Sequence, residues 1–488
     1  MRKMLSLLPA ILVSLTVSAR SQDGFETDWQ RESAAMVPAL EELAEFARKH
    51  KLFRECIRTY DLILIFSPDH EKARRFLRYS RKGKHGPWER RRPFKEPKNL
   101  SMDSIDEFKK RRKAIVGPFA RSIVQALDTH KDTVDAKQRQ EVLRKLIRVD
   151  PENPEARAAF GDVKSGDRWL PEDAVIAALQ RVEMRERAES IRDGVDPPRP
   201  TVLSDVEAKL GIRFLHTLET SHVRVLSTAD GDESSKVVRY CEAAPRLFNL
   251  VLKETVRHRE KYTVYLLAGG TEKKQFLDRH PDINASNRRF YEPLAGGWVN
   301  KFSGVCDWAG KSKTRIDYAV RQTNALCLTD AYGISIRQGW AFEGFGLYLT
   351  DLICNTKLTY YVKPSPYGAG RDSLRERLMR QEGDWFKEGL ALLKGPKRPD
   401  LGRVITLDAT AMIDEDMLYA YVLAAWLIET RSTKLRALLR DIARVDPEGK
   451  PLQKPAEVLK KHLGLGLDGL ELRIIRWLEA VTEEHPGG

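Results

Sequence analysis

The segment from Trp340 to Tyr348 constrains the fold more than any other stretch of this chain, because it is an apolar helix with one charged side chain, Glu343. A helix that is apolar on every side belongs in the interior of a domain. A carboxylate that is buried with it needs an opposite charge or hydrogen-bond donors. The pattern from about Ile316 to the end of the chain is also helical, so we expect helices on either side of this one.

The sequence pattern changes at about residue 206. Residues 222–226 and 262–267 are rich in β-branched and aromatic side chains, which predicts two strands with an amphipathic helix between them. A further strand or loop passes through residues 298–306. Strands followed by helices predict an α+β domain over residues 206–485, with a small sheet and a mostly helical C-terminal half.

Residues 20–189 have apolar positions at helical spacing, which predicts an N-terminal all-α helical-repeat region. Residues 68–74 align with residues 151–157, and in each copy Pro and an acidic residue separate two helices. This pattern resembles tetratricopeptide-like helical hairpins. The copies are separated by a basic insert, residues 80–115, that fits either a solvated loop or a polyanion site. The proline-rich residues 190–205 are predicted to form the linker to the second domain.

Residues 1–19 predict a secretory signal peptide. Arg2 and Lys3 precede an apolar run that is too short to span a bilayer, and Val17-Ser18-Ala19 fits the cleavage rule. We therefore expect an exported protein, periplasmic, in the cell envelope or secreted, with no transmembrane segment after signal cleavage. The formal net charge of +14 favours acidic proteins or an anionic envelope polymer over specific nucleic acid in that compartment, or else a solvated basic surface without a ligand.

The five cysteines are widely spaced and include no C-x-x-C pair, so they predict neither a zinc framework nor a dense disulfide scaffold. One bridge, between Cys306 and Cys327 or Cys354, and buried free thiols both fit this spacing. Gly310-Lys311-Ser312 and the run from Gly464 to Gly469 contain parts of nucleotide-binding motifs, but their surroundings indicate turns.

Three stretches of the chain together carry a family resemblance. They are the helix with Trp340, Glu343, Gly344 and Tyr348, the aromatic and glycine stretch from Tyr291 to Trp298, and the late helix from Leu418 to Trp426. The chain resembles the peptidase MA-like (gluzincin) families of bacterial exported proteins of unknown function, over roughly residues 206–480. The resemblance implies a zincin-like (thermolysin-like) fold, with Glu343 in the position of a metal ligand and Tyr419 or Tyr421 near the substrate.

In active members of such families, the helix ahead of the glutamate carries H-E-x-x-H, whose two imidazoles bind zinc while the glutamate acts as general base. Aligned on Glu343, the ligand slots here hold Arg321 and Ala325, and the general-base slot holds Gln322. A frame that is shifted by one residue gives Gln322 and Leu326. None of the ten histidines lies between residues 281 and 461, so no shift within that stretch restores the motif.

We therefore expect a catalytically inactive metalloprotease-like protein, without a cofactor, that acts as a binding or scaffolding module for a protein, a peptide or an envelope polymer. The alternative is an active metallohydrolase that holds zinc with Glu343 and non-standard ligands such as Asp330, Asp351 or Cys327. Arg321 carries a fixed positive charge where zinc would bind. It either replaces the metal electrostatically by pairing with Glu343, or points to solvent while backbone amides or water satisfy the carboxylate.

Overall fold

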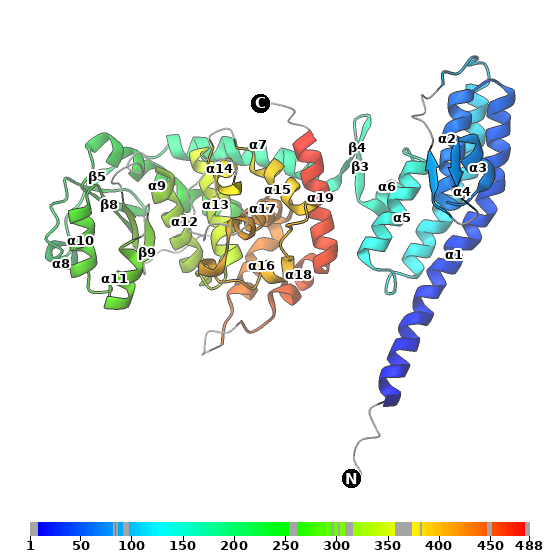
Figure 1. The fold of residues 1–488 in the computed structure, drawn as a ribbon. Coiled ribbons are helices and arrows are strands. Elements are labelled where there is room, and N and C mark those ends of the chain that lie inside the picture. Colours follow the sequence, from blue (N-terminus) through cyan, green and yellow to red (C-terminus); the bar gives the residue numbers. More distant parts are fainter. Residues whose placement is uncertain are drawn as a thin grey trace, which may run out of the picture. The chain divides into compact units, whose positions relative to one another are not determined.

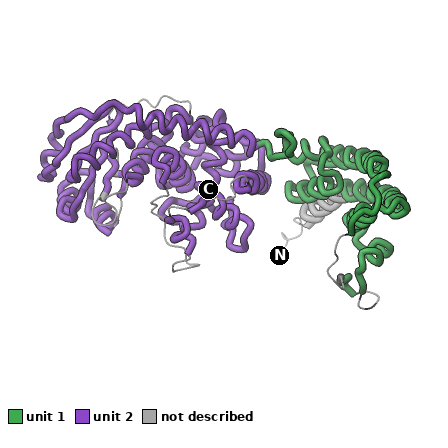
Figure 2. Tube along the Cα trace, turned by 90° about the horizontal axis from the view of Figure 1, so that it is seen from above, with its two compact units in different colours: residues 1–172 green, residues 173–488 purple. Residues whose placement is uncertain are grey.

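The computed structural model shows a mostly helical α+β protein, with 19 helices in the described part of the chain and a six-stranded mixed sheet in its middle region (Figure 1). This confirms the predicted class. Side chains at residues 8–23, 90, 300 and 307 are not described. The structure describes residues 8–81, 83, 86–90, 97–252, 261–293, 297–300, 303–307, 316–356, 373–380, 383–446 and 451–483. The chain divides into two compact units, Met1–Glu172 and Asp173–Gly488 (Figure 2).

The first unit contains two copies of one arrangement: a long helix, a second helix, a short helix and a β-hairpin. The first copy comprises α1 (Leu8–Lys49), α2 (Phe53–Phe66), α3 (Glu71–Phe76), β1 (Tyr79–Arg81) and β2 (Trp88–Arg90). The second copy comprises α4 (Ile105–Thr129), α5 (Ala136–Val149), α6 (Pro154–Phe160), β3 (Asp162–Ser165) and β4 (Arg168–Pro171). The two hairpins correct the prediction that residues 20–189 are all-α.

The same side-chain contacts hold the hairpin to the turn in both copies. An arginine of the short helix donates to the carbonyl of the turn proline, and an indole of the hairpin donates to the turn carboxylate. These contacts join Arg74 to Pro68 and Trp88 to Asp69 in the first copy, and Arg157 to Pro151 and Trp169 to Glu152 in the second. The strands are too short for a periodic signal, so these four contacts explain why the hairpins form.

The basic insert, residues 80–115, is described only in part, because residues 82, 84–85 and 91–96 lie outside the described residues. Its last part is the exposed start of α4, where Lys109 pairs with Asp106 and Arg111 with Glu107. The first seven residues of the predicted signal peptide also lie outside the described residues, and its cleavage stays a prediction. No described helix is long and apolar enough to cross a bilayer.

The sheet of the second unit has the strand order β5-β6-β7-β8-β10-β9, and its three central strands, β7, β8 and β10, are parallel. Alternate residues face opposite sides, as strand geometry requires. Val225, Val264 and Cys306 belong to the main core, whereas Tyr265 and Val305 belong to a smaller core on the other face. The strands are β5 (Arg199–Pro200), β6 (His216–Glu219), β7 (Val223–Ser227), β8 (Tyr262–Leu267), β9 (Trp298–Asn300) and β10 (Ser303–Asp307).

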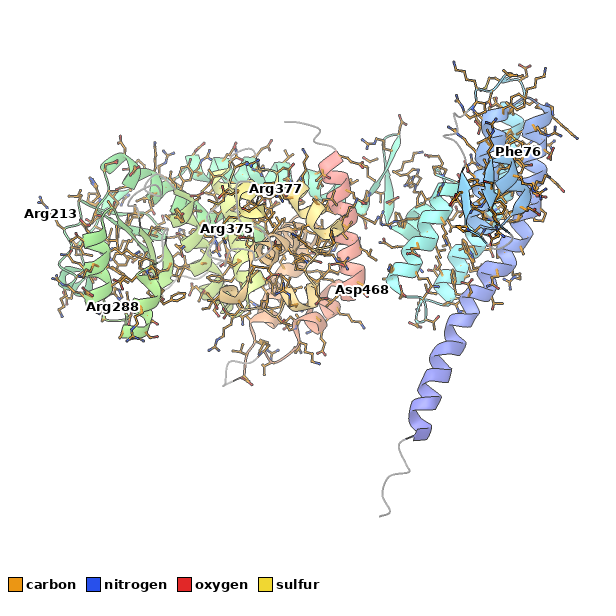
Figure 3. All side chains as sticks on the ribbon, viewed as in Figure 1. Phe76, Arg213, Arg288, Arg375, Arg377 and Asp468 are labelled. Carbon is orange, nitrogen blue, oxygen red and sulfur yellow. The ribbon has the colours of Figure 1, made fainter. Side chains whose placement is uncertain are left out.

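Helices of the second unit cover both faces of the sheet and form the rest of the unit. α12 packs against α9 and β10, and α13 packs against α12 and α17. The helices are α7 (Glu172–Asp193), α8 (Asp205–Lys209), α9 (Gly231–Leu252), α10 (Gly270–Arg279), α11 (Ala285–Tyr291), α12 (Ile316–Tyr332), α13 (Gly339–Cys354), α14 (Leu374–Met379), α15 (Trp385–Lys394), α16 (Leu401–Val404), η2 (Ala409–Ala411), α17 (Asp414–Ala443), α18 (Pro455–Leu463) and α19 (Leu467–Glu483). Arg375 of α14, labelled in Figure 3, pairs with Asp414 of α17.

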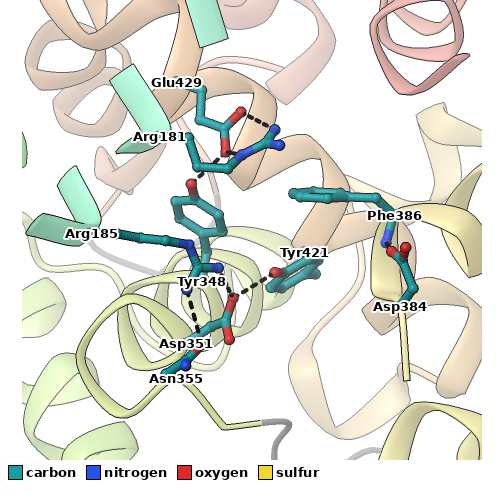
Figure 4. A network of polar contacts seen from close by, with 9 residues as sticks. All are labelled: Arg181, Arg185, Tyr348, Asp351, Asn355, Asp384, Phe386, Tyr421 and Glu429. Atoms are coloured by element: carbon teal, nitrogen blue, oxygen red, sulfur yellow. Dashed lines mark hydrogen bonds and ion pairs between the residues drawn. The ribbon is translucent and has the colours of Figure 1, made fainter. Parts of the chain in front are cut away.

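Helix α7 is fastened to the second unit by buried ion pairs, so the unit begins well before the predicted linker at residues 190–205. Arg181 makes two hydrogen bonds to Glu429, which also accepts from the Tyr348 hydroxyl (Figure 4). Arg185 pairs with Asp351, which also accepts from the Tyr421 hydroxyl. At the other end of α7, Asp173 accepts from Trp426, Arg431 and Arg473.

The predicted linker is itself part of the folded unit. Residues 199–200 form β5 and pair with β6 in the sheet, and Ser204 and Glu207 form a capping box at the start of α8. The prolines of this segment therefore belong to an edge strand and a turn, and the segment is not a flexible linker between domains.

We predict that a chain of residues 173–488 folds and that a chain of residues 206–488 does not. The shorter chain lacks Arg181 and Arg185, and an uncompensated charge in the interior costs about 3–5 kcal/mol per pair, which approaches the whole stability of a domain. Urea unfolding followed by circular dichroism measures both chains. Equal unfolding free energies would show that α7 is dispensable for this fold.

Candidate functional site

Arg321 of α12 and Glu343 of α13 form a buried ion pair, which is one of the two arrangements that the sequence left open. The Arg321 Nη2 nitrogen lies 2.9 Å from the Glu343 Oε2 oxygen and 3.1 Å from the Phe342 carbonyl oxygen. The two side chains are 2% and 4% exposed, so water screens their attraction little. The guanidinium thus lies across from Glu343, at the position where the family resemblance would place a metal ligand.

Gly346 makes room for this guanidinium. A Cβ atom on Gly346 would lie 2.4 Å from Arg321 Nη1 and 2.6 Å from Cζ, which is closer than real atoms approach. Gly344, two residues earlier, faces the other neighbour of α13, where a Cβ would lie 2.3 Å from the Ala420 carbonyl oxygen of α17. One turn of α13 therefore has glycine on two faces. Gly346 leaves room for the guanidinium, and Gly344 lets α17 pack closely.

A cavity of about 470 Å³ opens at the ion pair. Its wall is largely aromatic and aliphatic, and Gln322 and Glu343 are the polar side chains from the two helices. The described lining residues are Phe290, Tyr291, Gly297, Trp298, Val299, Gln322, Ile336, Phe342, Glu343, Ala409 and Thr410. A partly open site of this size with apolar walls and a few polar groups is typical of ligand pockets.

Three elements beside the helices position this wall. Strand β9 brings Trp298 and Val299 to the end of the described sheet, where it pairs with β10. The Trp298 ring stacks on Tyr291, with 5.1 Å between the ring centroids and 14° between the planes. The loop before α13 meets η2 through the hydrogen bond from Ala409 N to Ile336 O.

The structure brings together some of the predicted site residues and separates others. Gln322, in the general-base slot, lines the cavity beside Glu343. Ala325, in the second ligand slot, is fully buried and does not line the cavity. An amide at Gln322 can donate and accept hydrogen bonds but does not act as a base at neutral pH.

Tyr419 and Tyr421 do not line the cavity, although the resemblance placed one of them near the substrate. The Tyr419 hydroxyl donates to Glu471, and the Tyr421 hydroxyl donates to Asp351. Burial raises the pKa of both phenols, and the neighbouring carboxylates raise the pKa further. Both tyrosines therefore stay neutral and support the packing of α17.

The non-standard metal ligands that the sequence left open are not gathered at the site. Asp351 pairs with Arg185, and burial raises the pKa of the Cys327 thiol, which disfavours the thiolate that binds metals. Among the described residues, no group of three or more His, Cys, Asp or Glu side chains is placed to hold a metal ion. With a guanidinium against Glu343, these residues do not fit a zinc ion. All five cysteines are free thiols.

Sequence reasoning missed three cavity residues that come from short elements and a loop. Ile336 of the loop before α13 and Phe290 of α11 are about half exposed, at 48% and 54%, and Thr410 is exposed in η2. None of the three belongs to a periodic pattern or a motif, so only the fold brings them beside Glu343. Tyr291 and Trp298 come from the stretch that carries the family resemblance, but the sequence did not place them in a cavity wall.

Comparison with protein-family models finds no matching family, and comparisons with curated proteins and with solved structures find no match either. The site is therefore interpreted from its own geometry.

We predict that Gly346→Ala destabilises the protein only while Arg321 is present. In the wild-type background the added Cβ meets the guanidinium, which costs about 1–3 kcal/mol. In an Arg321→Ala/Glu343→Gln background the same change is neutral or stabilises by up to about 1 kcal/mol, because alanine is the better helix former. Urea unfolding gives all four free energies.

Gly344→Ala is the matched control, because its Cβ would meet the backbone of α17 whether or not Arg321 is present. It is expected to destabilise both backgrounds. An equal cost of Gly346→Ala in the two backgrounds would contradict the coupling between Gly346 and Arg321.

Proposed function

We propose that this chain is a non-catalytic binding protein whose cavity between β9, α12 and α13 holds a segment of a peptide or protein partner. One observation carries the proposal. The polar groups in the wall that come from the two helices are an amide and a carboxylate that is already paired with an arginine, and they are surrounded by apolar and aromatic side chains. Such a wall can bind and orient a ligand, and Arg321 already neutralises the one carboxylate that these two helices place in it.

The position of β9 favours an extended peptide as the occupant. It is the last strand of the described sheet, and its Trp298 and Val299 lie in the cavity wall. An extended chain that adds to a sheet edge gains main-chain hydrogen bonds, and pockets beside the edge select its side chains. The apolar wall beside this strand would take one such side chain.

An anionic envelope polymer is the weaker candidate for this cavity. Its charges would approach the Glu343 carboxylate, and most of the wall offers no hydrogen-bond donors. The net positive charge of the chain would attract such a polymer to the outer surface without a shaped site, and that binding would fall steeply with salt.

We also propose that the domain has a peptidase MA-like (gluzincin) ancestry and that Arg321 replaced the metal. Arg321, Gln322 and Glu343 have the spacing of a first ligand, a base and a third ligand, and two of them line one cavity. The guanidinium supplies one positive charge next to Glu343, so the carboxylate keeps a counter-charge without zinc.

Peptide binding should depend on the cavity. We expect the mature protein to bind a subset of immobilised unstructured peptides and to leave them uncleaved. Thr410→Trp would fill part of the cavity from an exposed position and weaken binding at least about 10-fold, since filling a pocket removes its contacts. Thr406→Trp, on an exposed residue outside the cavity wall, is the control.

If the peptide affinity of Thr410→Trp equals that of the wild-type protein, the cavity is not the binding site. Peptide cleavage that a chelator abolishes, together with stoichiometric zinc in the purified protein, would favour the metallohydrolase alternative.

Restoring the three slots should create a zinc site if the ancestry is right. We expect Arg321→His/Gln322→Glu/Ala325→His to bind one zinc ion per chain, because imidazoles four residues apart lie on one helix face toward Glu343. The control moves the second histidine out of that face, as Arg321→His/Gln322→Glu/Leu326→His. Metal analysis and circular dichroism of both folded variants are the measurements. Equal zinc content in the two would contradict the assigned frame.

A further inference from the structure

Within the described residues, one carboxylate oxygen of Glu343 has no hydrogen-bond partner, and Glu343 lines the cavity. The side chain is buried and lines the cavity, and its Oε2 oxygen accepts from Arg321. Its Oε1 oxygen has no hydrogen-bond partner among the residues that the structure describes. A ligand that covers this oxygen without supplying a donor leaves it unpaired at a cost in free energy, whereas a ligand with a donor avoids that cost. Glu343 therefore favours a ligand group that donates a hydrogen bond at this point of the wall.

The charges around the cavity favour a neutral donor. Arg321 already balances the charge of Glu343. An ammonium group in the cavity would lose its hydration without gaining an unbalanced carboxylate as a partner. A carboxylate or phosphate would meet the Glu343 oxygen directly.

The wall favours an aromatic ligand group. Tyr291 and Trp298 stack on each other, and Phe342 lies on the same side of the ion pair, with the Arg321 Cζ 5.1 Å from its ring centroid. Phe290 extends this wall and is about half exposed. Aromatic rings gain from offset or edge contacts with such a wall beyond the area that they bury.

We propose that the cavity recognises a neutral aromatic group with one N–H donor, as in the indole of a tryptophan side chain, and that this donor binds Glu343 Oε1. The inference rests on the proposed function, because it names the side chain that a bound peptide places in the cavity. Arg321 is then a positioning residue, because it holds Oε2 and leaves Oε1 for the ligand.

Four small probes test the proposal on the full mature chain by isothermal titration calorimetry. Indole has the donor, and benzothiophene has the same shape without it. Tryptamine adds a positive charge and indole-3-acetate a negative one. We expect indole to bind about 10-fold more tightly than benzothiophene, as for one unmade hydrogen bond at a buried acceptor, and more tightly than either charged probe.

A variant without the ion pair provides the matched comparison. Arg321→Met/Glu343→Leu removes the acceptor and the cation together, and replacing a buried pair by apolar residues is often neutral for stability. In this variant the advantage of indole over benzothiophene should disappear. Thr410→Trp should abolish the binding of both, and Leu179→Ala, on an exposed residue of α7, should change neither.

Equal affinities of indole and benzothiophene for the wild-type protein would overturn the role of Glu343 Oε1. Tighter binding of tryptamine would overturn the neutral donor. If peptides bind in a way that Thr410→Trp prevents but show no preference for tryptophan, this inference fails while the proposed function stands. If indole binds and no peptide does, the donor site is supported and the proposed function fails.

Discussion

The buried ion pair between Arg321 and Glu343 is the interaction on which the centre of the second unit depends. Both charges are shielded from water, so each would be costly without the other. The pair fixes how closely α12 and α13 approach, and Gly346 is the residue that lets them do so. The pair also gives the two oxygens of Glu343 different surroundings. Arg321 binds Oε2, whereas Oε1 stays beside the cavity.

Charged residues of helix α7 are also paired with opposite charges inside the second unit, and these partners lie far away in the sequence. Arg181 and Asp173 find their partners about 250 residues or more further along the chain, at Glu429 and Arg473. A helix that supplies cations to two buried carboxylates, and a buried carboxylate to two arginines, is part of that interior. This is why the second unit begins at Asp173, although the proline-rich sequence after α7 suggested a later boundary.

The sequence was sufficient where local pattern and chemistry determine the structure. Stretches rich in β-branched and aromatic residues indicated β7 and β8, and the apolar segment indicated α13. The isolated charge of Glu343 called for a cation or hydrogen-bond donors, and Arg321 supplies the cation. It failed where the determinants are distant or small. The hairpins of the first unit depend on single contacts of Trp88 and Trp169, and the cavity wall includes loop residues such as Ile336 that only tertiary structure brings to α13.

Under the proposed ancestry, an arginine in place of a metal changes what the site can do. A zinc ion keeps an open position where water binds and becomes a nucleophile, whereas a guanidinium has no such position and keeps its protons at every physiological pH. What Arg321 can do is to hold Glu343 in a fixed orientation. Under the proposed function, that orientation is the useful property, because an acceptor that is held in place before binding loses little entropy when the ligand arrives.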